Sequence, residues 1–398
     1  MLNTDVVEAA RKLFPHIEQK KLYLNHASTS PLSVRVVEAI AAYYNQRMLG
    51  TLENYQNDIV MVARCRDMVR RLINAESVDR IAFTTSTTEA INIVSSGLPW
   101  KHGDRILLND LDFPANVYPY MNLRRLGVEI DIAKSVKGAI PVETIAGALT
   151  PQTRLVALSA VQFLSGYRAD LKEIGELCRQ RNIIFAVDAI QAIGAVHVDV
   201  QDDRIDALAT GCQKWQMAPH GAGYLYLTEE LQSRIRQQHC GWLGAENPWD
   251  FFNYNQPLAA TARRYEGGSM NMPSLWGLHA ALSTIQEFGS SAIESHILAI
   301  TEMLAKGLQS IEGVTLYSPE AECNRAGIVT IDLAPHLDAR MCFDLMMKRN
   351  ITLGLRDGKL RYSPHFYNSP GDMEAVIEAT RECIKMAGDS KPHRVKSS

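Results

Sequence analysis

Residues 183–188 of the chain read Ile-Ile-Phe-Ala-Val-Asp, a short apolar run that ends in a carboxylate. A run of this length and β-branched content is typical of a strand that is buried on both faces, as in a parallel sheet covered by helices. A helical pattern over 171–181 comes directly before it. This alternation of helix and strand predicts an α/β fold, and it continues in both directions along the chain.

The alternation extends over residues 81–227. Seven segments have the character of strands: 81–84, 105–108, 128–132, 155–159, 183–187, 207–210 and 223–227. Segments of helical spacing separate several of them, at 117–126, 142–149 and 171–181. We therefore expect a doubly wound domain with a mostly parallel, seven-stranded sheet.

Beyond residue 267 the pattern changes to longer helices with fewer strands. Helical spacing covers 275–288 and 293–311, strands are expected near 327–333 and 359–363, and Ser369 followed by Pro370 predicts the start of a last helix. Helical patterns also occur at 6–14 and 36–44. We expect four parts: an N-terminal segment packing with the small domain (1–20), a large domain (21–266), a small α+β domain (267–388) and a frayed tail (389–398).

The charge balance and the cysteines narrow the class of protein. The 398 residues carry 41 Lys and Arg against 44 Asp and Glu, a formal net charge of −3, which gives no reason to expect a nucleic-acid partner. Seven cysteines without a C-x-x-C pair favour a reducing, cytoplasmic environment. We expect no signal peptide, no membrane association and, since the histidines lack ligand spacing, no metal site.

Two groups of polar residues follow strand candidates at the edge where ligands bind in α/β sheets. Residues 84–89, Thr-Thr-Ser-Thr-Thr-Glu, lie before a helix, and Ser86 and Glu89 have the spacing of a capping box. The hydroxyls and free N–H groups of such a helix start can bind an anion, although a capped helix without a ligand is the alternative. Asp188 ends a buried strand, where a carboxylate is costly unless it is paired. Its alternative role is to cap the following turn.

Two cationic side chains complete the set of candidates. Lys214 follows the strand at 207–210 and precedes a glycine-rich stretch, so that partial desolvation would lower its pKa and make it a nucleophile. A solvated surface lysine is the alternative. Arg361 lies within the strand expected at 359–363, and a guanidinium on a rigid strand suits bidentate capture of a carboxylate. An exposed strand arginine is the alternative there.

Taken together, the anion site, the buried carboxylate, the lysine and the arginine ask for one ligand. It would carry a phosphate, a basic ring nitrogen and an aldehyde, and its substrate would carry a carboxylate. Pyridoxal phosphate with an α-amino acid meets these demands. The chain resembles the class V aminotransferases of fold type I, a family that also contains cysteine desulfurases, isopenicillin N epimerase-like enzymes and kynureninases. The resemblance runs from Tyr23-Leu24-Asn25-His26-Ala27 to Arg361-Tyr362-Ser363-Pro364-His365-Phe366-Tyr367-Asn368.

This resemblance implies a role for each matching residue. Lys214 matches the Schiff-base lysine and Asp188 the partner of the pyridine nitrogen. The other cofactor-binding positions are Gln191 at the phenolic oxygen, Ser86, Thr87, Thr88 and Gln213 at the phosphate, Phe113 stacked on the ring, and Ser269, which a neighbouring subunit lends to the phosphate. A homodimer follows from the last of these. The resemblance also gives Arg361 the substrate carboxylate, with Arg356 as the next candidate. Four further residues are candidates for lining the substrate pocket, with ordinary packing as the equally plausible alternative for each: His26, Asn54, Tyr55 and Trp242.

Three departures from the cysteine desulfurases shape the expected reaction. Residues 349–359 contain no cysteine where those enzymes carry their nucleophile, Val161-Gln162-Phe163 lacks their asparagine, and Gly211 replaces a phosphate-binding serine. We therefore expect Cα deprotonation of a free α-amino acid, with transamination narrowly favoured. The alternatives are a cysteine desulfurase, C–S lyase or epimerase of the same family, and a non-catalytic binding or regulatory protein with this fold.

Overall fold

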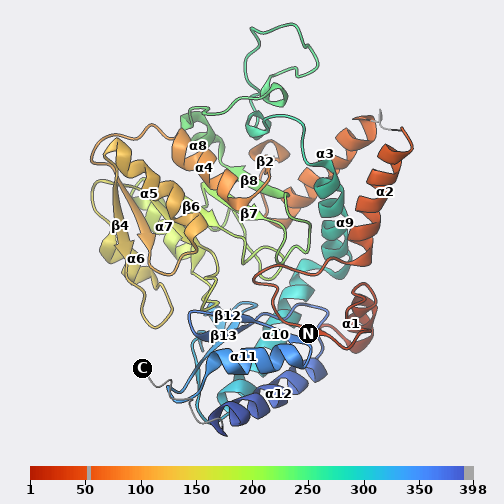
Figure 1. The fold of residues 1–398 in the computed structure, drawn as a ribbon. Coiled ribbons are helices and arrows are strands. Elements are labelled where there is room, and N and C mark those ends of the chain that lie inside the picture. Colours follow the sequence, from red (N-terminus) through yellow and green to blue (C-terminus); the bar gives the residue numbers. More distant parts are fainter. Residues whose placement is uncertain (52–54, 390–398) are drawn as a thin grey trace, which may run out of the picture.

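The computed structural model describes residues 1–51 and 55–389, so the tail expected to be frayed lies, beyond Asp389, outside the described residues. A seven-stranded sheet forms the centre of the large domain, in the order β2-β8-β7-β6-β5-β3-β4 (Figure 1). Its strands are β2 (Ile81–Thr84), β3 (Arg105–Asn109), β4 (Glu129–Ala133), β5 (Thr153–Ser159), β6 (Ile184–Asp188), β7 (Ala207–Gly211) and β8 (Gly223–Leu227). Strand β8 runs in the opposite direction to the other six strands of this sheet, which are parallel to one another. The mostly parallel, seven-stranded sheet is therefore confirmed.

Helices cover both faces of this sheet. They are α2 (Val34–Met48), α3 (Tyr55–Leu72), α4 (Thr87–Gly97), α5 (Tyr118–Met121), α6 (Val142–Ala148), α7 (Leu171–Gln180), α8 (Glu229–Arg234) and α9 (Met272–Phe288). Successive side chains of β6 enter the cores on opposite faces of the sheet. Phe185 and Val187 join the core under α3, α7 and α9. Ile184 and Ala186 join the core under α4. All five β6 residues are buried, as a strand covered on both faces requires.

The small domain is built on an antiparallel sheet. Its strand order is β12-β13-β10-β9, from β9 (Val314–Leu316), β10 (Val329–Leu333), β12 (Gly354–Arg356) and β13 (Lys359–Tyr362). A separate parallel pair joins β1 (Leu22–Tyr23) to β11 (Ile351–Thr352), so residues near the start of the chain contribute to this domain. The remaining helices are α1 (Thr4–Arg11), α10 (Ser290–Gln309), α11 (Ala339–Lys348) and α12 (Pro370–Asp389).

Helix α9 lies beyond the boundary expected at residue 267, yet it packs with the helices of the large domain. This helix packs against α2 and α3, and Leu278 and Leu282 belong to the core of the large domain. The division falls inside α10, where Ile297 lies in the large core and Ile300 in the small one. Burial of the apolar stripe of α9 against two other helices, and not the change in sequence pattern near Gly267, therefore decides the boundary.

The N-terminal segment contacts both domains, whereas the sequence predicted packing with the small one. Phe14 stacks on Tyr367 with ring centroids 4.0 Å apart and lies in the core of the large domain. Arg11 pairs with Asp372 at the start of α12, 2.6 Å between Nη1 and Oδ2. The segment thus ties the two domains together at the outside of the fold.

Two helices differ from the sequence expectations. The single helix expected at 117–126 is a short α5 flanked by 3₁₀ turns, bounded by Pro119 in its first turn and by Gly127 at φ 78°. Helix α3 was not anticipated, although Met61, Cys65 and Val69 repeat every four residues along its buried side.

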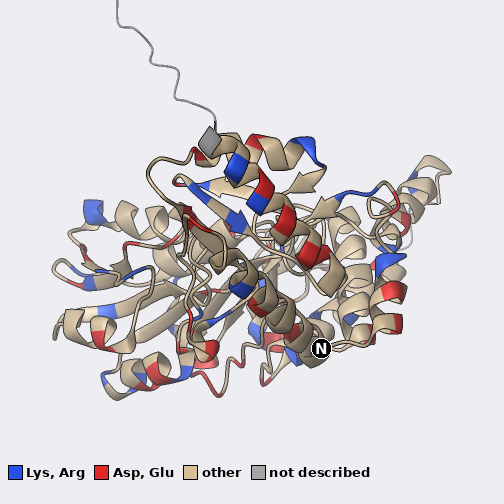
Figure 2. Cartoon of the chain, turned by 90° about the horizontal axis from the view of Figure 1, so that it is seen from below, with Lys and Arg blue, Asp and Glu red and all other residues tan. Residues whose placement is uncertain are grey.

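The charged side chains of both signs are mixed on the surface (Figure 2), as the small formal net charge of −3 predicts. Figure 2 shows Lys and Arg interspersed with Asp and Glu over the helices seen from below. Within the described residues, no helix is both long and apolar enough to cross a membrane.

A segment of aromatic residues projects from the large domain at the top of Figure 1, where Phe252 and Tyr254 are each 87% exposed.

Strand β2 lies at the edge of the sheet, and a buried ion pair covers it. Glu266 accepts the backbone N–H of Phe83 at 2.8 Å and pairs with Arg66 at 2.7 Å, and Arg66 also donates to the carbonyl of Ile81. The two side chains are only 1% and 13% exposed. Side chains from α3 and from the segment before α9 therefore take the place of a neighbouring strand.

We expect Glu266→Ala to lower the free energy of unfolding by about 3–5 kcal/mol, because it leaves the Arg66 cation and the Phe83 N–H without their acceptor. Glu287→Ala is the matched control, since its pair with Arg35 is 53% and 39% exposed and is worth less than about 1 kcal/mol. Urea unfolding of both variants measures the difference. Equal losses would contradict this role of Glu266.

Candidate active site

The carboxyl ends of three neighbouring strands bring the main candidates together. Asp188 is the last residue of β6 and pairs in register with Ser159 of β5 and Ala209 of β7. Lys214 follows three residues after the end of β7. Because these strands are parallel, their carboxyl ends lie at one edge of the sheet, where α/β folds bind ligands.

Asp188 is a buried carboxylate with one open oxygen. It is 2% exposed, and its Oδ1 accepts the N–H of Ile190 at 3.0 Å, so the expected turn-capping role is present. Its Oδ2 makes no hydrogen bond within the described chain. Burial raises the pKa of Asp188 to about 6, against the opposing pull of Lys214.

Lys214 is held in a rigid turn. Ser30 donates its N–H to the carbonyl of Gln213 at 2.9 Å and its hydroxyl to the carbonyl of Lys214 at 2.5 Å. Met217, at φ 55°, turns the chain back so that its N–H bonds the Lys214 carbonyl. Desolvation lowers the pKa of Lys214 to about 8, with smaller contributions from Arg361 and Arg356 against the raising effect of Asp188. Lys214 is therefore not a solvated surface lysine.

An aromatic ring lies open beside this amine. Phe113 is 45% exposed, and its ring centroid is 5.6 Å from Lys214 Nζ. The edge of Phe163 supports it, with centroids 5.3 Å apart at 76°. A large apolar ring kept exposed next to a buried amine is suited to cover a flat ligand.

The helix start at 84–89, where an anion site is expected, carries the cap that the sequence predicts. Ser86 caps α4 by accepting the N–H of Glu89, whose carboxylate in turn binds Thr85. The hydroxyl of Thr87 is buried without a partner within the described chain. A Cβ added at Gly211 would lie 2.5 Å from Gln213 Oε1 and 3.3 Å from Thr87 Oγ1. A glycine where a serine would intrude, an unpaired buried hydroxyl and the positive end of α4 together fit a phosphate.

Arg361 is a buried cation without an acidic partner in the described structure. It is 1% exposed; Nη1 donates to the carbonyl of Phe163 at 2.6 Å and Nη2 to Ser28 Oγ at 2.8 Å, while Nε has no partner. Burial and the neighbouring Arg356 lower the pKa of Arg361 to about 10. The alternative of an exposed strand arginine is wrong, because the side chain is buried. Buried charges are generally paired, so this guanidinium is suited to bind an anion.

Gln191 and His26 have different surroundings from those expected. Gln191 donates to the carbonyl of Ala27 and accepts the indole N–H of Trp215, each at 2.9 Å, so most of its amide is used to hold the Lys214 turn. His26 is fully buried, and its two nitrogens bond the Ser363 carbonyl and the Tyr367 hydroxyl. The expectation that His26 lines a substrate pocket is therefore not supported, because neither nitrogen is available.

The remaining candidates lie further out. Arg356 is exposed and reaches Ser28 Oγ at 3.2 Å, and Ser269 is exposed on the loop before α9. Tyr55, the first residue of α3, and Trp242 both contact Trp249 of the projecting aromatic segment. Asn54 lies outside the described residues. Thr88, in the first turn of α4, uses its carbonyl to bind Asn92.

Two residues of the site were not singled out from the sequence. Asp112 accepts Ser159 N–H and the amides of Gln162, Asn109 and Asn116, and burial with the nearby Asp188 raises its pKa to about 7. Its position just after strand β3 is the signal that would have found it. Ser28, which binds both arginines, offers no comparable signal.

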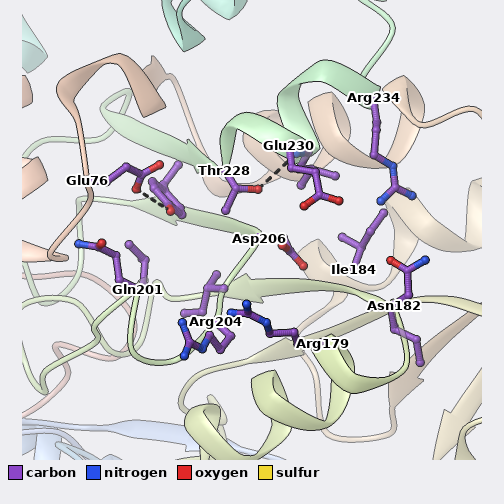
Figure 3. A pocket seen from close by; sticks show the side chains of 15 residues that line it. Glu76, Arg179, Asn182, Ile184, Gln201, Arg204, Asp206, Thr228, Glu230 and Arg234 are labelled. Atoms are coloured by element: carbon purple, nitrogen blue, oxygen red, sulfur yellow. Dashed lines mark hydrogen bonds between the residues drawn. The ribbon is translucent and has the colours of Figure 1, made fainter.

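A cavity of about 410 Å³ lies elsewhere, at the amino ends of β6 and β7 (Figure 3). Both carboxylates and guanidinium groups line it, among them Glu76, Asp206, Arg179, Arg204 and Arg234. These strand ends are opposite to Asp188 and Lys214, so the cavity is separate from the candidate site. In the described part of the chain, no group of three or more His, Cys, Asp or Glu residues is placed to hold a metal ion.

Known proteins resemble this chain over nearly its whole length. A probable cysteine desulfurase of Methanothermobacter thermautotrophicus is 28% identical over 92% of this chain and 95% of its own. The uncharacterized aminotransferase YcbU of Bacillus subtilis is also 28% identical, over 93% and 96% of the two chains.

Solved structures share the fold. The cysteine desulfurase of Thermococcus onnurineus superposes with a TM-score of 0.86 at 24% identity, covering 97% of this chain and 99% of its own. The cystine C–S lyase C-DES, solved with its product cysteine persulfide, gives 0.85 at 24% identity over 93% and 99%. A variant of C-DES was solved with glycine linked to its pyridoxal phosphate cofactor. The expected fold type I is thereby confirmed.

The model of the family described as aminotransferase class-V matches residues 22–359. This range contains every candidate at the edge of the large sheet, whereas Arg361 of strand β13 in the small domain lies two residues beyond it. Because the match spans most of the chain, the protein belongs to the aminotransferase class-V family, a family of pyridoxal phosphate-dependent enzymes.

Proposed function

We propose that the protein binds pyridoxal phosphate through Lys214 and acts on a free α-amino acid. The observation that carries this proposal is the Lys214 amine, desolvated beside Asp188 and the open Phe113 ring, with the unpaired cation of Arg361 at the same site. These groups provide an attachment point, a partner for a ring nitrogen, a cover for a ring and a receptor for a carboxylate. The carboxyl edge of the large sheet, together with strand β13 of the small domain, thus meets the needs of both cofactor and substrate.

The bound cofactor would supply an electron sink for the negative charge that develops at the substrate Cα. Asp188 Oδ2 would keep a proton on the pyridine nitrogen. Ser86, Thr87, Thr88 and Gln213 would hold the phosphate. Lys214 would move the Cα proton, and its pKa of about 8 is close to the value at which a general base works best near neutral pH.

For the reaction we propose cleavage of a C–S bond without a protein thiol. The narrow preference for transamination is not supported by the relatives, several of which are named cysteine desulfurases. Residues 349–359 contain no cysteine, and among the described residues only Cys240 and Cys323 are exposed. An S-substituted cysteine would lose its Cα proton to Lys214 and its thiolate from Cβ, and water would convert the remainder to pyruvate and ammonium.

We further propose that the enzyme is a homodimer. Ser269 is exposed and lies close in sequence to the projecting aromatic segment, where Phe252 and Tyr254 are almost fully exposed. Large exposed aromatic side chains are typical of surfaces that bind another protein chain. The cytoplasmic location stays a prediction from the unpaired cysteines.

Lys214→Ala is expected to abolish the visible absorbance of the lysine-bound cofactor and to lower the rate of turnover by about 10²–10⁴-fold or more, because the proton-transferring amine is gone. Lys172→Ala is the control, since that lysine pairs with Asp202 on the surface. Spectra of both purified variants with added pyridoxal phosphate make the measurement. An unchanged spectrum of the Lys214 variant would overturn the cofactor assignment.

The type of reaction is tested with amino acids supplied one at a time. S-substituted cysteines are expected to yield thiol, pyruvate and ammonium in equal amounts, while the cofactor returns to its starting form. Accumulation of pyridoxamine phosphate would instead establish transamination and rule out the elimination. Binding without turnover of any amino acid would favour a non-catalytic role.

Arg361→Ala is expected to weaken substrate binding by about 1.5–3 kcal/mol, which is about 10–150-fold in KM, because a charged hydrogen-bonding partner of the carboxylate is lost. Arg349→Ala, which removes an exposed pair with Glu382, is expected to leave KM unchanged. Steady-state kinetics compares the two variants. An unaltered KM in the Arg361 variant would place the carboxylate site elsewhere.

A further inference from the structure

A second guanidinium lies at the site beside that of Arg361. Arg361 Nη2 and Arg356 Nη2 donate to the same hydroxyl, Ser28 Oγ, at 2.8 and 3.2 Å. Ser28 in turn donates to Asn25 Oδ1 at 2.8 Å. The hydroxyl has two lone pairs, and the two arginines use both of them. One neutral group therefore fixes two cations close to each other.

The backbone explains why both arginines lie on one side. Strands β12 and β13 form a hairpin in which Gly354 pairs with Arg361 and Arg356 with Lys359. Side chains alternate along a strand, so Arg356 shares the face of Gly354, which is also the face of Arg361. The connecting residues Asp357 and Gly358 both have positive φ, 47° and 71°, as the favoured two-residue hairpin turn requires. The register is thus fixed by a tight turn.

These two arginines differ from the others of the small domain. Among the described residues from 310 onward, Arg325, Arg340, Arg349 and Arg381 each pair with a carboxylate. Arg356 and Arg361 have no carboxylate partner within the described chain. The guanidinium groups of Arg356 and Arg361 repel each other beside the partly buried Lys214. The site is therefore complementary to a ligand with more than one negative charge.

The two cations lie at different depths. Arg361 is buried, and both guanidinium groups lower the pKa of Lys214, Arg361 more than Arg356. Arg356 is exposed at the end of its strand. An α-carboxylate adjoins the Cα that Lys214 would deprotonate, and the proposed function assigns it to the buried Arg361. Arg356, at the surface beside it, would then meet a second acid further along the substrate.

We propose that the substrate is an α-amino acid whose side chain ends in a second acid, a carboxylate, and that Arg356 binds this distal group. The inference rests on the proposed function, which assigns the α-carboxylate to Arg361. In a C–S cleavage the distal acid belongs to the departing thiol. Arg356 is then a residue that determines specificity, and Ser28 positions it.

The test compares S-carboxymethylcysteine with S-carbamoylmethylcysteine, which has nearly the same shape but a neutral amide. For the holoenzyme, both kcat/KM and the dissociation constant from the change in cofactor absorbance are measured. We expect the acid to be favoured by about 10–100-fold, the range for one charged hydrogen-bonding partner. Arg356→Ala is expected to bring this ratio close to one, mainly through the acid, and Arg356→Lys to restore part of it.

Two variants separate this inference from the proposed function. Arg361→Ala is expected to weaken both ligands by the same factor, so that the ratio persists, and Arg349→Ala to leave the ratio as it is. A wild-type ratio near one, or equal losses for both ligands in Arg356→Ala, would overturn the distal-acid site. Preferential binding of the acid without turnover would overturn the proposed reaction and leave the distal-acid site supported.

Discussion

The ammonium group of Lys214, withdrawn from water beside Asp188, is the arrangement on which the rest of the site depends. Burial disfavours both charges, lowering the pKa of the lysine and raising that of the aspartate, while their mutual attraction offsets part of this cost. Such a pair persists only where the backbone positions both partners. Here the carboxyl ends of β6 and β7 provide that support, because adjacent parallel strands cannot shift relative to each other without breaking the centre of the sheet.

Trp215 transmits this support to the other parts of the molecule. Its indole binds Gln191, its carbonyl receives His365 at 2.9 Å, and its ring packs so closely on Gly327 that a Cβ there would lie 2.2 Å away. Trp215, the neighbour of Lys214, therefore links the turn after β7 to segments that lie far away in the sequence. The five buried cysteines include Cys65 and Cys178, whose thiol pKa burial raises to about 12, so these sulfurs are unreactive packing groups. The sulfur chemistry proposed for the site would depend on the substrate alone.

The parts of the fold that could be predicted are those determined by local pattern. The run of five apolar residues at 183–187 predicts strand β6. Asp188 and Lys214 stand out in the sequence because each comes after an apolar run of this kind. The positions of α9, Gln191 and His26 could not be predicted, since each depends on partners far away in sequence: α2 and α3 for the helix, Trp215 for the amide, and Ser363 and Tyr367 for the imidazole. The same holds for Arg356, whose meaning comes from sharing Ser28 with Arg361.

Helix α10 has twenty residues, about 30 Å of continuous helix, and its two halves are buried in different cores. Ile293 and Ile297 belong to one core, Ile300 and Leu304 to the other. A hinge between the domains would have to break this helix in its buried middle. The length of one continuous helix therefore sets the spacing between the two hydrophobic cores.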